Sequence, residues 1–96
     1  MPDEIKPHNA ALLASVQLHN IYASVSVYAE MEDPEGNNND LWTYVQAACL
    51  AADTSRALVN LANAAALMGD STGEIAYTNA IRELHQMMLK HKTAAA

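Results

Sequence analysis

The sequence predicts an all-α protein, a three-helix antiparallel (up-down-up) bundle with two long helices and one shorter C-terminal helix. Alanine, the best helix former, supplies 19 of the 96 residues. Apolar residues recur at alternating spacings of three and four, which places them on one face of a helix. Proline and glycine interrupt this pattern near residues 34–36 and at residue 69, which divides the chain into three long segments.

The first helix is expected to begin at Ala10, because the side chain of Asn9 is a plausible N-cap. It should end near Glu32 or Asp33, because Pro34 disfavours a helical residue before it and donates no amide hydrogen. The apolar stripe that we expect to face the core consists of Ala11, Ala14, Leu18, Ile21, Val25 and Tyr28.

The second helix is expected to run from Leu41 to about Met68, after a loop at 34–39, with Asn39 or Asp40 as its cap. A polar stripe follows its length with heptad-like spacing, through Gln46, Asp53, Arg56, Asn60 and Asn63. The segment 53–55 is an alternative cap that would split this helix in two. The unbroken polar stripe favours one helix.

The third helix is expected from about Thr72 to about Lys92. Gly69 suits the left-handed residue that ends a helix, and Ser71 with Glu74 matches a capping box. Its apolar stripe comprises Tyr77, Ile81, Leu84 and Met88. Short connections between long helices favour antiparallel neighbours. We therefore expect a single helical domain over residues 1–96, with flexible ends at 1–8 and 93–96.

Two of the three helices carry almost no charge along their shafts. No charged residue occurs between Lys6 and Glu30, and only Asp53 and Arg56 are charged between residues 40 and 70. The exposed side of a bundle helix is usually rich in Lys and Glu. A neutral, alanine-rich surface is one interpretation. The one we prefer is contact with another protein chain, self or different, through Leu13, Val16, Gln17, Asn20, Ser24, Val27, Trp42 and Tyr44.

The densest charge on the chain is a cluster of five carboxylates within eleven residues. Its spacing does not fit the helix-loop-helix calcium pattern, in which ligands alternate and glycine is sixth. A solvated turn is the simplest interpretation, and an acidic docking patch for a basic partner is the second. The cluster comprises Glu30, Glu32, Asp33, Glu35 and Asp40.

Nothing in the sequence indicates catalysis, a cofactor or a metal site. No two of the four histidines have the i, i+4 spacing that places two metal ligands on one helix face. His19 is expected to be a hydrogen-bonded residue at a bundle edge, and Cys49 a small core residue. The net charge of −6 argues against nucleic-acid binding. The chain has no run of 18 apolar residues, so no membrane span is expected. The single cysteine and the absence of a visible signal peptide favour the cytoplasm.

One segment of about 28 residues resembles a tetratricopeptide-type helical hairpin. The resemblance is carried by the stretch 57–64, the Gly69-Asp70 turn, Ile75 and Tyr77. Glu74 stands where that family places a small alanine, and no second repeat is visible. The resemblance therefore implies an alanine-rich helical hairpin and no membership of the family.

These features together predict a small non-catalytic interaction protein: an adaptor, chaperone or inhibitor of a larger partner that acts as a homo-oligomer. Its size and composition are common among bacterial and phage accessory proteins. A different class of function is also open. A small molecule held between helices or subunits is the alternative, with Tyr22, Tyr28, His19 and Asn20 as its lining.

Overall fold

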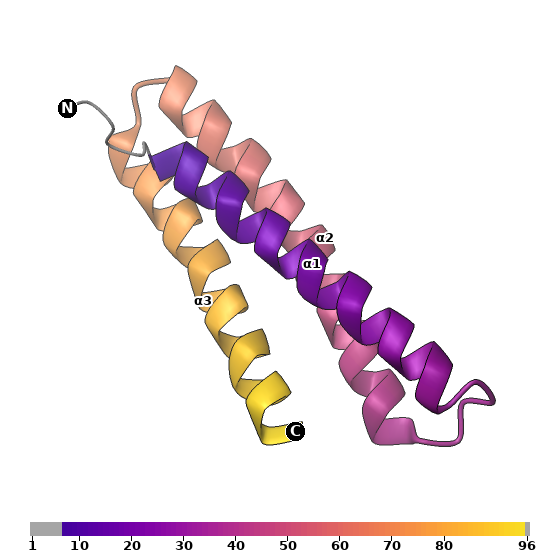
Figure 1. Cartoon of the computed structure of the whole chain (residues 1–96). Coiled ribbons are helices and arrows are strands. Elements are labelled where there is room, and N and C mark those ends of the chain that lie inside the picture. The colour runs from indigo at the N-terminus through magenta and orange to yellow at the C-terminus, as the bar shows by residue number, and fades with distance from the viewer. Residues whose placement is uncertain (1–6, 96) are drawn as a thin grey trace.

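The computed structural model describes residues 7–95, and the side chains of residues 9–90. Three helices make up the described chain, α1 (Pro7–Glu32), α2 (Asn39–Leu67) and α3 (Ser71–Ala95), with no strand among these residues (Figure 1). The prediction of an all-α three-helix bundle is confirmed. The third helix has 25 residues and the first has 26, so α3 is shorter than α1 by a single residue.

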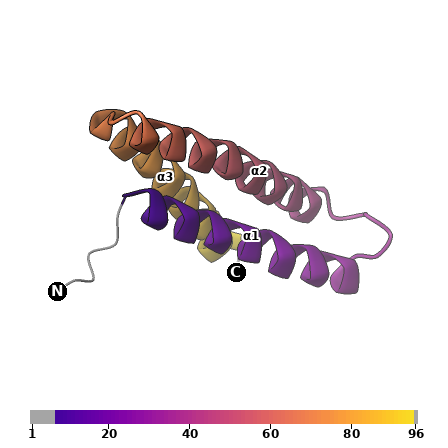
Figure 2. The ribbon, with the colours of Figure 1, turned by 90° about the horizontal axis from the view of Figure 1, so that it is seen from above.

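The helices alternate in direction and form an elongated molecule. Figure 1 shows α2 returning alongside α1, and α3 then running in the direction of α1. The principal extents of the chain are 49 × 25 × 18 Å. In the two ribbon views α1 and α2 extend past the end of α3 toward their connecting loop (Figures 1 and 2). The loop end of the bundle is therefore built from two helices, whereas the rest is built from three.

The core is made mainly of small side chains. Leu18, Ile81 and Ser55 are the largest side chains that are fully buried. Alanines fill much of the remaining space, and they allow helix axes to approach closely. The buried alanines are Ala11, Ala14, Ala29, Ala48, Ala51, Ala52, Ala62 and Ala65.

The predicted core stripe of α1 is correct except at its C-terminal end. Ala11, Ala14 and Leu18 are buried, but Tyr28 is 56% exposed and Ala29 is fully buried. Eleven residues complete about three turns of an α-helix, so Ala29 lies directly along the helix from Leu18. A stripe that continues with spacings of three and four drifts around the helix away from this line. The prediction that Tyr28 faces the core, which followed this spacing, is therefore wrong.

Helix α1 begins earlier than predicted. Its first residue is Pro7, and Asn9 lies within the first turn, so Asn9 is not the N-cap. Proline suits the first helical position, because its fixed φ is already helical and its missing amide hydrogen has no partner there. Of the predicted flexible lead-in, residues 1–6 lie outside the described residues. At the other end the chain stays helical through Ala95, whereas fraying was expected from Thr93.

Helix α2 is continuous, as the polar stripe predicted, and Asp53 lies inside it. Its cap is Asn38, one residue before the candidates Asn39 and Asp40. The Asn38 side-chain oxygen accepts a hydrogen bond from the amide of Leu41 at 3.1 Å. All three residues have side chains able to cap. The loop conformation places Asn38, with extended backbone angles, at the position that reaches the first turn.

The turn between α2 and α3 corrects the predicted capping box. Gly69 has φ of +74° and its amide donates to the Ala66 carbonyl, while the Asp70 amide donates to Ala65, the pattern of a Schellman motif. The Asp70 carboxylate then accepts from the Gly73 amide at 2.9 Å. Asp70 is therefore both the last residue of the turn that ends α2 and the N-cap of α3, and Ser71 is the first helical residue rather than the cap.

Candidate interaction surfaces

An exposed apolar stripe runs along α1 on the side opposite the core. We define the outer α1 face as Leu13, Val16, Asn20, Ala23 and Val27, all of which are exposed. Leu13 is 52% exposed, Val16 46% and Val27 57%. Consecutive members are three or four residues apart, so they align along one side of the helix. Residues Gln17 and Ser24, which were predicted with this set, are exposed beside it.

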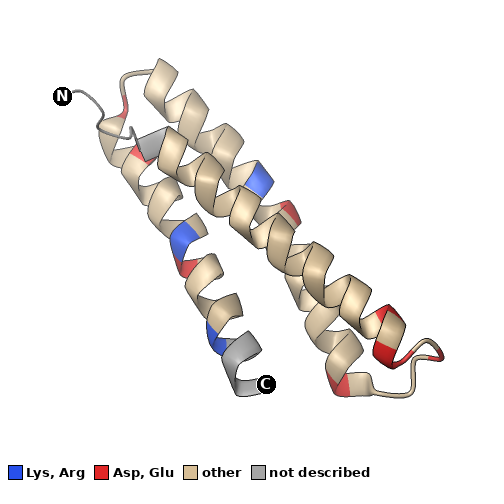
Figure 3. Cartoon of the chain, viewed as in Figure 1, with Lys and Arg blue, Asp and Glu red and all other residues tan. Residues whose placement is uncertain are grey.

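The outer α1 face carries no charge. In Figure 3 the α1 ribbon shows no charged residue between its first described residues and the turn that precedes the loop. The first acidic residue on the shaft is Glu30. An exposed helix side without Lys or Glu is unusual for a soluble bundle, and apolar surface of this kind marks interaction sites.

The two aromatic residues of the predicted partner site are used within the chain. The Trp42 indole donates a hydrogen bond to the Asp33 carboxylate at 2.9 Å, and the Tyr44 hydroxyl donates to the Met88 carbonyl at 3.1 Å. Both side chains are half-buried. Removal from water raises the pKa of the Tyr44 hydroxyl above its ordinary value. The structure therefore separates Trp42 and Tyr44 from the outer α1 face and places them at bundle contacts.

Helix α2 has a second uncharged stripe that the predicted site omits. Leu50 is 67% exposed and Leu61 is 45% exposed, with Thr54 and Ala57 exposed between them. These residues also follow spacings of four, three and four. The signal is present in the sequence, but most of α2 is apolar, and only the structure shows which of its apolar residues face outward.

The predicted polar residues of α2, here called the polar strip, contact α1 through Arg56; the set is Gln46, Asp53, Arg56, Asn60 and Asn63. The Arg56 guanidinium donates to His19 Nε2 at 2.8 Å, and His19 Nδ1 lies 2.8 Å from the Ser15 carbonyl oxygen. A guanidinium group has no acceptor, so His19 Nε2 must accept its hydrogen bond, and the Nδ1–H group must donate to the Ser15 carbonyl oxygen. Both ring nitrogens are thus occupied, in agreement with the prediction that His19 is a hydrogen-bonded residue at a bundle edge.

The acidic cluster lies at the loop end of the bundle, but its members differ in role (Figure 3). Glu30, Glu32, Glu35 and Asp40 are exposed. The half-buried Asp33 instead organises the loop.

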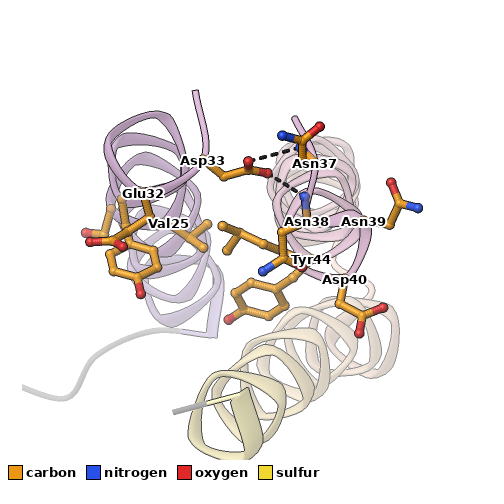
Figure 4. A pocket seen from close by; sticks show the side chains of 11 residues that line it. Val25, Glu32, Asp33, Asn37, Asn38, Asn39, Asp40 and Tyr44 are labelled. Carbon is orange, nitrogen blue, oxygen red and sulfur yellow. Dashed lines mark hydrogen bonds between the residues drawn. The ribbon is translucent and has the colours of Figure 1, made fainter. Parts of the chain in front are cut away.

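The Asp33 carboxylate accepts hydrogen bonds from the amides of Asn38 at 2.6 Å and Asn37 at 3.0 Å (Figure 4). It also accepts one from the Trp42 indole. These donors, the Asn38 amide foremost, lower the pKa of the Asp33 carboxyl below its ordinary value. Asp33 is therefore engaged within the chain, whereas the other four carboxylates of the predicted acidic patch are exposed.

An open cleft of about 1340 Å³ lies between the end of α1 and the start of α2. Figure 4 shows Val25 of α1 and Tyr44 of α2 lining it, with Glu32 and Asp40 at its edge. Of the residues predicted to hold a small molecule, only Tyr28 lines this cleft.

Tyr22 contacts the half-buried Cys49, and this neighbour raises the pKa of the Tyr22 hydroxyl. Among the described residues no group of three or more His, Cys, Asp or Glu side chains is placed to hold a metal ion. The side chains of His8 and His91 lie outside the described residues.

Comparison of the chain with protein-family models, curated proteins and solved structures finds no match. Helix α1 has one further property, its length and apolar character. The 24-residue segment Asn9–Glu32 is long and apolar enough to cross a membrane by length and composition. A core helix of a soluble protein passes the same test, and this segment contributes Ala11, Ala14 and Leu18 to the core. The segment is thus only weak support for a membrane span.

Proposed function

We propose that this chain is a small non-catalytic protein–protein interaction protein, an adaptor, chaperone or inhibitor of a larger partner, that works in the cytoplasm as an oligomer. The observation that carries the proposal is the outer α1 face, with three large apolar side chains about half exposed and no charged residue on α1 between Leu13 and Val27. Burying such surface is the main favourable term in protein association.

The polar groups of the bundle support a non-catalytic role. His19 has a hydrogen-bond partner at each nitrogen, and the most constrained carboxylate, Asp33, holds the loop. A catalytic acid or base needs reach toward a substrate atom. The remaining carboxylates of the loop end are exposed, and exposed acidic groups suit a secondary contact with a basic region of the partner.

Photo-crosslinking tests whether the outer α1 face contacts protein in the cell. A benzoylphenylalanine introduced at Val16 should give covalent protein adducts after irradiation, because this position lies within the outer α1 face. The same probe at Asn60, which is exposed on the polar strip of α2, is the matched control. Adducts at Val16 no more abundant than those at Asn60 would rule out the proposal.

A ligand-binding module is the second candidate function, and the cleft at the loop end favours it. Two tyrosines, Tyr28 and Tyr44, line this cleft beside the apolar Val25 and Leu41. Pockets that bind small molecules combine apolar walls with a few polar groups. A thermal-shift panel of nucleotides, amines and metabolites tests this idea, and a hit should lose its shift in Tyr28→Ala. A panel that moves nothing counts against a ligand in this cleft.

A further inference from the structure

The outer α1 face has the geometry of a second helix-packing seam. Its spacings of three, four, three and four repeat every seven residues, as in helices that pack along their length against another helix. The inner side of α1 already packs on α2 and α3. Asn20 lies at the middle of the outer seam, with apolar residues before and after it. A single polar residue at such a position sets the register and number of packed helices.

The occupant that fits this seam best is a second copy of the same chain. A neutral face has no charge with which to select a charged partner. Its complement is therefore a surface that is equally neutral and equally long. The face itself is such a surface. The Asn20 amide has both donors and acceptors, so two copies of it satisfy each other across a two-fold axis.

Charge at the loop end decides the orientation. The exposed carboxylates of Glu30, Glu32, Glu35 and Asp40 all lie at one end of the bundle (Figure 3). Two copies with parallel α1 helices place these groups together, and like charges that meet at an interface disfavour association. Antiparallel helices place them at opposite ends, about 30 Å apart for a helix of this length, and also pair the helix dipoles favourably.

We propose that the chain forms an antiparallel homodimer through α1, with its two-fold axis close to Asn20 and with Leu13 of each copy near Val27 of the other. The proposal rests on the proposed function and names its partner. From Leu13 to Val27 the seam is about 21 Å long and about 12 Å wide, or roughly 250 Å² of flat area on each copy. This is below the roughly 600 Å² that each partner buries in the smallest standard interfaces, so we expect a weak dimer with a dissociation constant of about 100 μM.

Sedimentation equilibrium of the whole chain from about 1 μM to about 1 mM tests the dimer. The wild type should change from monomer to dimer across this range. Asn20→Asp places two carboxylates at the axis and should weaken the dimer at least tenfold. Asn60→Asp makes the same charge change on the polar strip of α2 and should leave the dissociation constant unchanged. Circular dichroism of both variants checks that the exposed substitutions keep the helices.

Two results overturn the dimer. One is a wild-type chain that stays monomeric up to about 1 mM, and the other is equal weakening by Asn20→Asp and Asn60→Asp. Flotation with phosphatidylcholine vesicles tests a separate alternative, in which the outer α1 face binds a membrane. If Val16→Glu abolishes vesicle binding that the wild type shows, the outer α1 face docks on a lipid surface and the homodimer is wrong.

Cysteine cross-linking tests the orientation in a Cys49→Ser background. The double variant Leu13→Cys/Val27→Cys should form a disulfide-linked dimer under mild oxidation, because an antiparallel arrangement brings these positions together. Leu13→Cys alone should link slowly. Fast linking of Leu13→Cys alone indicates parallel helices and overturns the antiparallel arrangement.

The mass of the photo-crosslinked adduct separates this inference from the proposed function. An adduct at Val16 of twice the chain mass supports both. An adduct of the chain with a different protein, and none with itself, leaves the interaction function standing and overturns the homodimer. Absence of any adduct above the Asn60 control overturns both.

Discussion

A buried pair of serines joins α1 to α2 and allows a quantitative test of the core. Ser15 and Ser55 are 4% and 0% exposed, and their hydroxyl oxygens are 2.7 Å apart. The Ser55 hydroxyl also donates to the Ala52 carbonyl at 2.7 Å. A serine has one hydroxyl proton, so Ser55 must accept from Ser15. The two serines are therefore unequal: Ser15 depends on Ser55 as its acceptor, whereas the Ser55 proton is satisfied within its own helix.

This inequality predicts the ranking of three variants. Ser55→Ala leaves the buried Ser15 hydroxyl without an acceptor, which costs about 1–3 kcal/mol. The better helix propensity of alanine returns about 0.5 kcal/mol, so the net loss is about 0.5–2.5 kcal/mol. Ser15→Ala removes only one hydrogen bond, worth about 1 kcal/mol, and its net loss is about 0.5 kcal/mol. The double variant removes both polar groups and should be close to the wild type.

Urea unfolding followed by far-ultraviolet circular dichroism measures these differences. The double-mutant cycle cancels the helix-propensity contribution and should give a coupling energy of about 1–3 kcal/mol between the two serines. In a chain of this size, 1 kcal/mol shifts the melting temperature by about 4–8 °C. A coupling energy below about 0.3 kcal/mol, or a larger loss in Ser15→Ala than in Ser55→Ala, would refute the assignment of donor and acceptor.

Three further outcomes follow from the two loops. Because the pKa of Asp33 is lowered from 3.8 in the fold, foremost by the Asn38 amide, its contribution to stability is present above pH 3.8 and is lost as the pH falls through the lowered value. Asp33→Asn should therefore show a smaller loss of stability between pH 7 and acid in urea titrations, and an unchanged acid dependence contradicts this. Gly69→Ala places a side chain at φ +74° and should destabilise the fold by about 1 kcal/mol, measured in the same way. Asp70→Ala should lower the melting temperature, at a cost of about 1 kcal/mol, whereas Ser71→Ala should not. The opposite ranking would show that Ser71, and not Asp70, caps α3.

The helix ends show how far local chemistry carries a prediction. Pro34 and Gly69 were predicted to interrupt the helices, because each ends a helix through its own backbone conformation and that of the adjacent residues. The caps were each displaced by one residue, since Asn38 and Asn39, like Asp70 and Ser71, are chemically able to do the same task. The path of the turn chooses between them. Turn geometry depends on the angle at which two helices meet, and that angle is a property of the packed bundle.

Tyr28, Trp42 and Tyr44 show a second limit. Each was placed from its apolar character or its position in the pattern. The structure exposes Tyr28, bonds Trp42 to the loop carboxylate and bonds Tyr44 to the backbone of α3. These outcomes depend on partners 9 and 44 residues away for Trp42 and Tyr44. No local pattern reports such contacts, because they form only when distant segments are brought together.

The sequence by itself determined the class of fold, the number of helices and the neutrality of α1. Helix periodicity, turn residues and charge each depend only on residues that are close together in the sequence. It also indicated Leu13, Val16 and Val27 as surface residues, because they fall opposite the apolar stripe. Only the tertiary structure decided that α2 has an outward apolar stripe through Leu50 and Leu61, since an almost uniformly apolar helix does not reveal which side its neighbours cover. Burial is a relation between helices, and the packed bundle alone defines it.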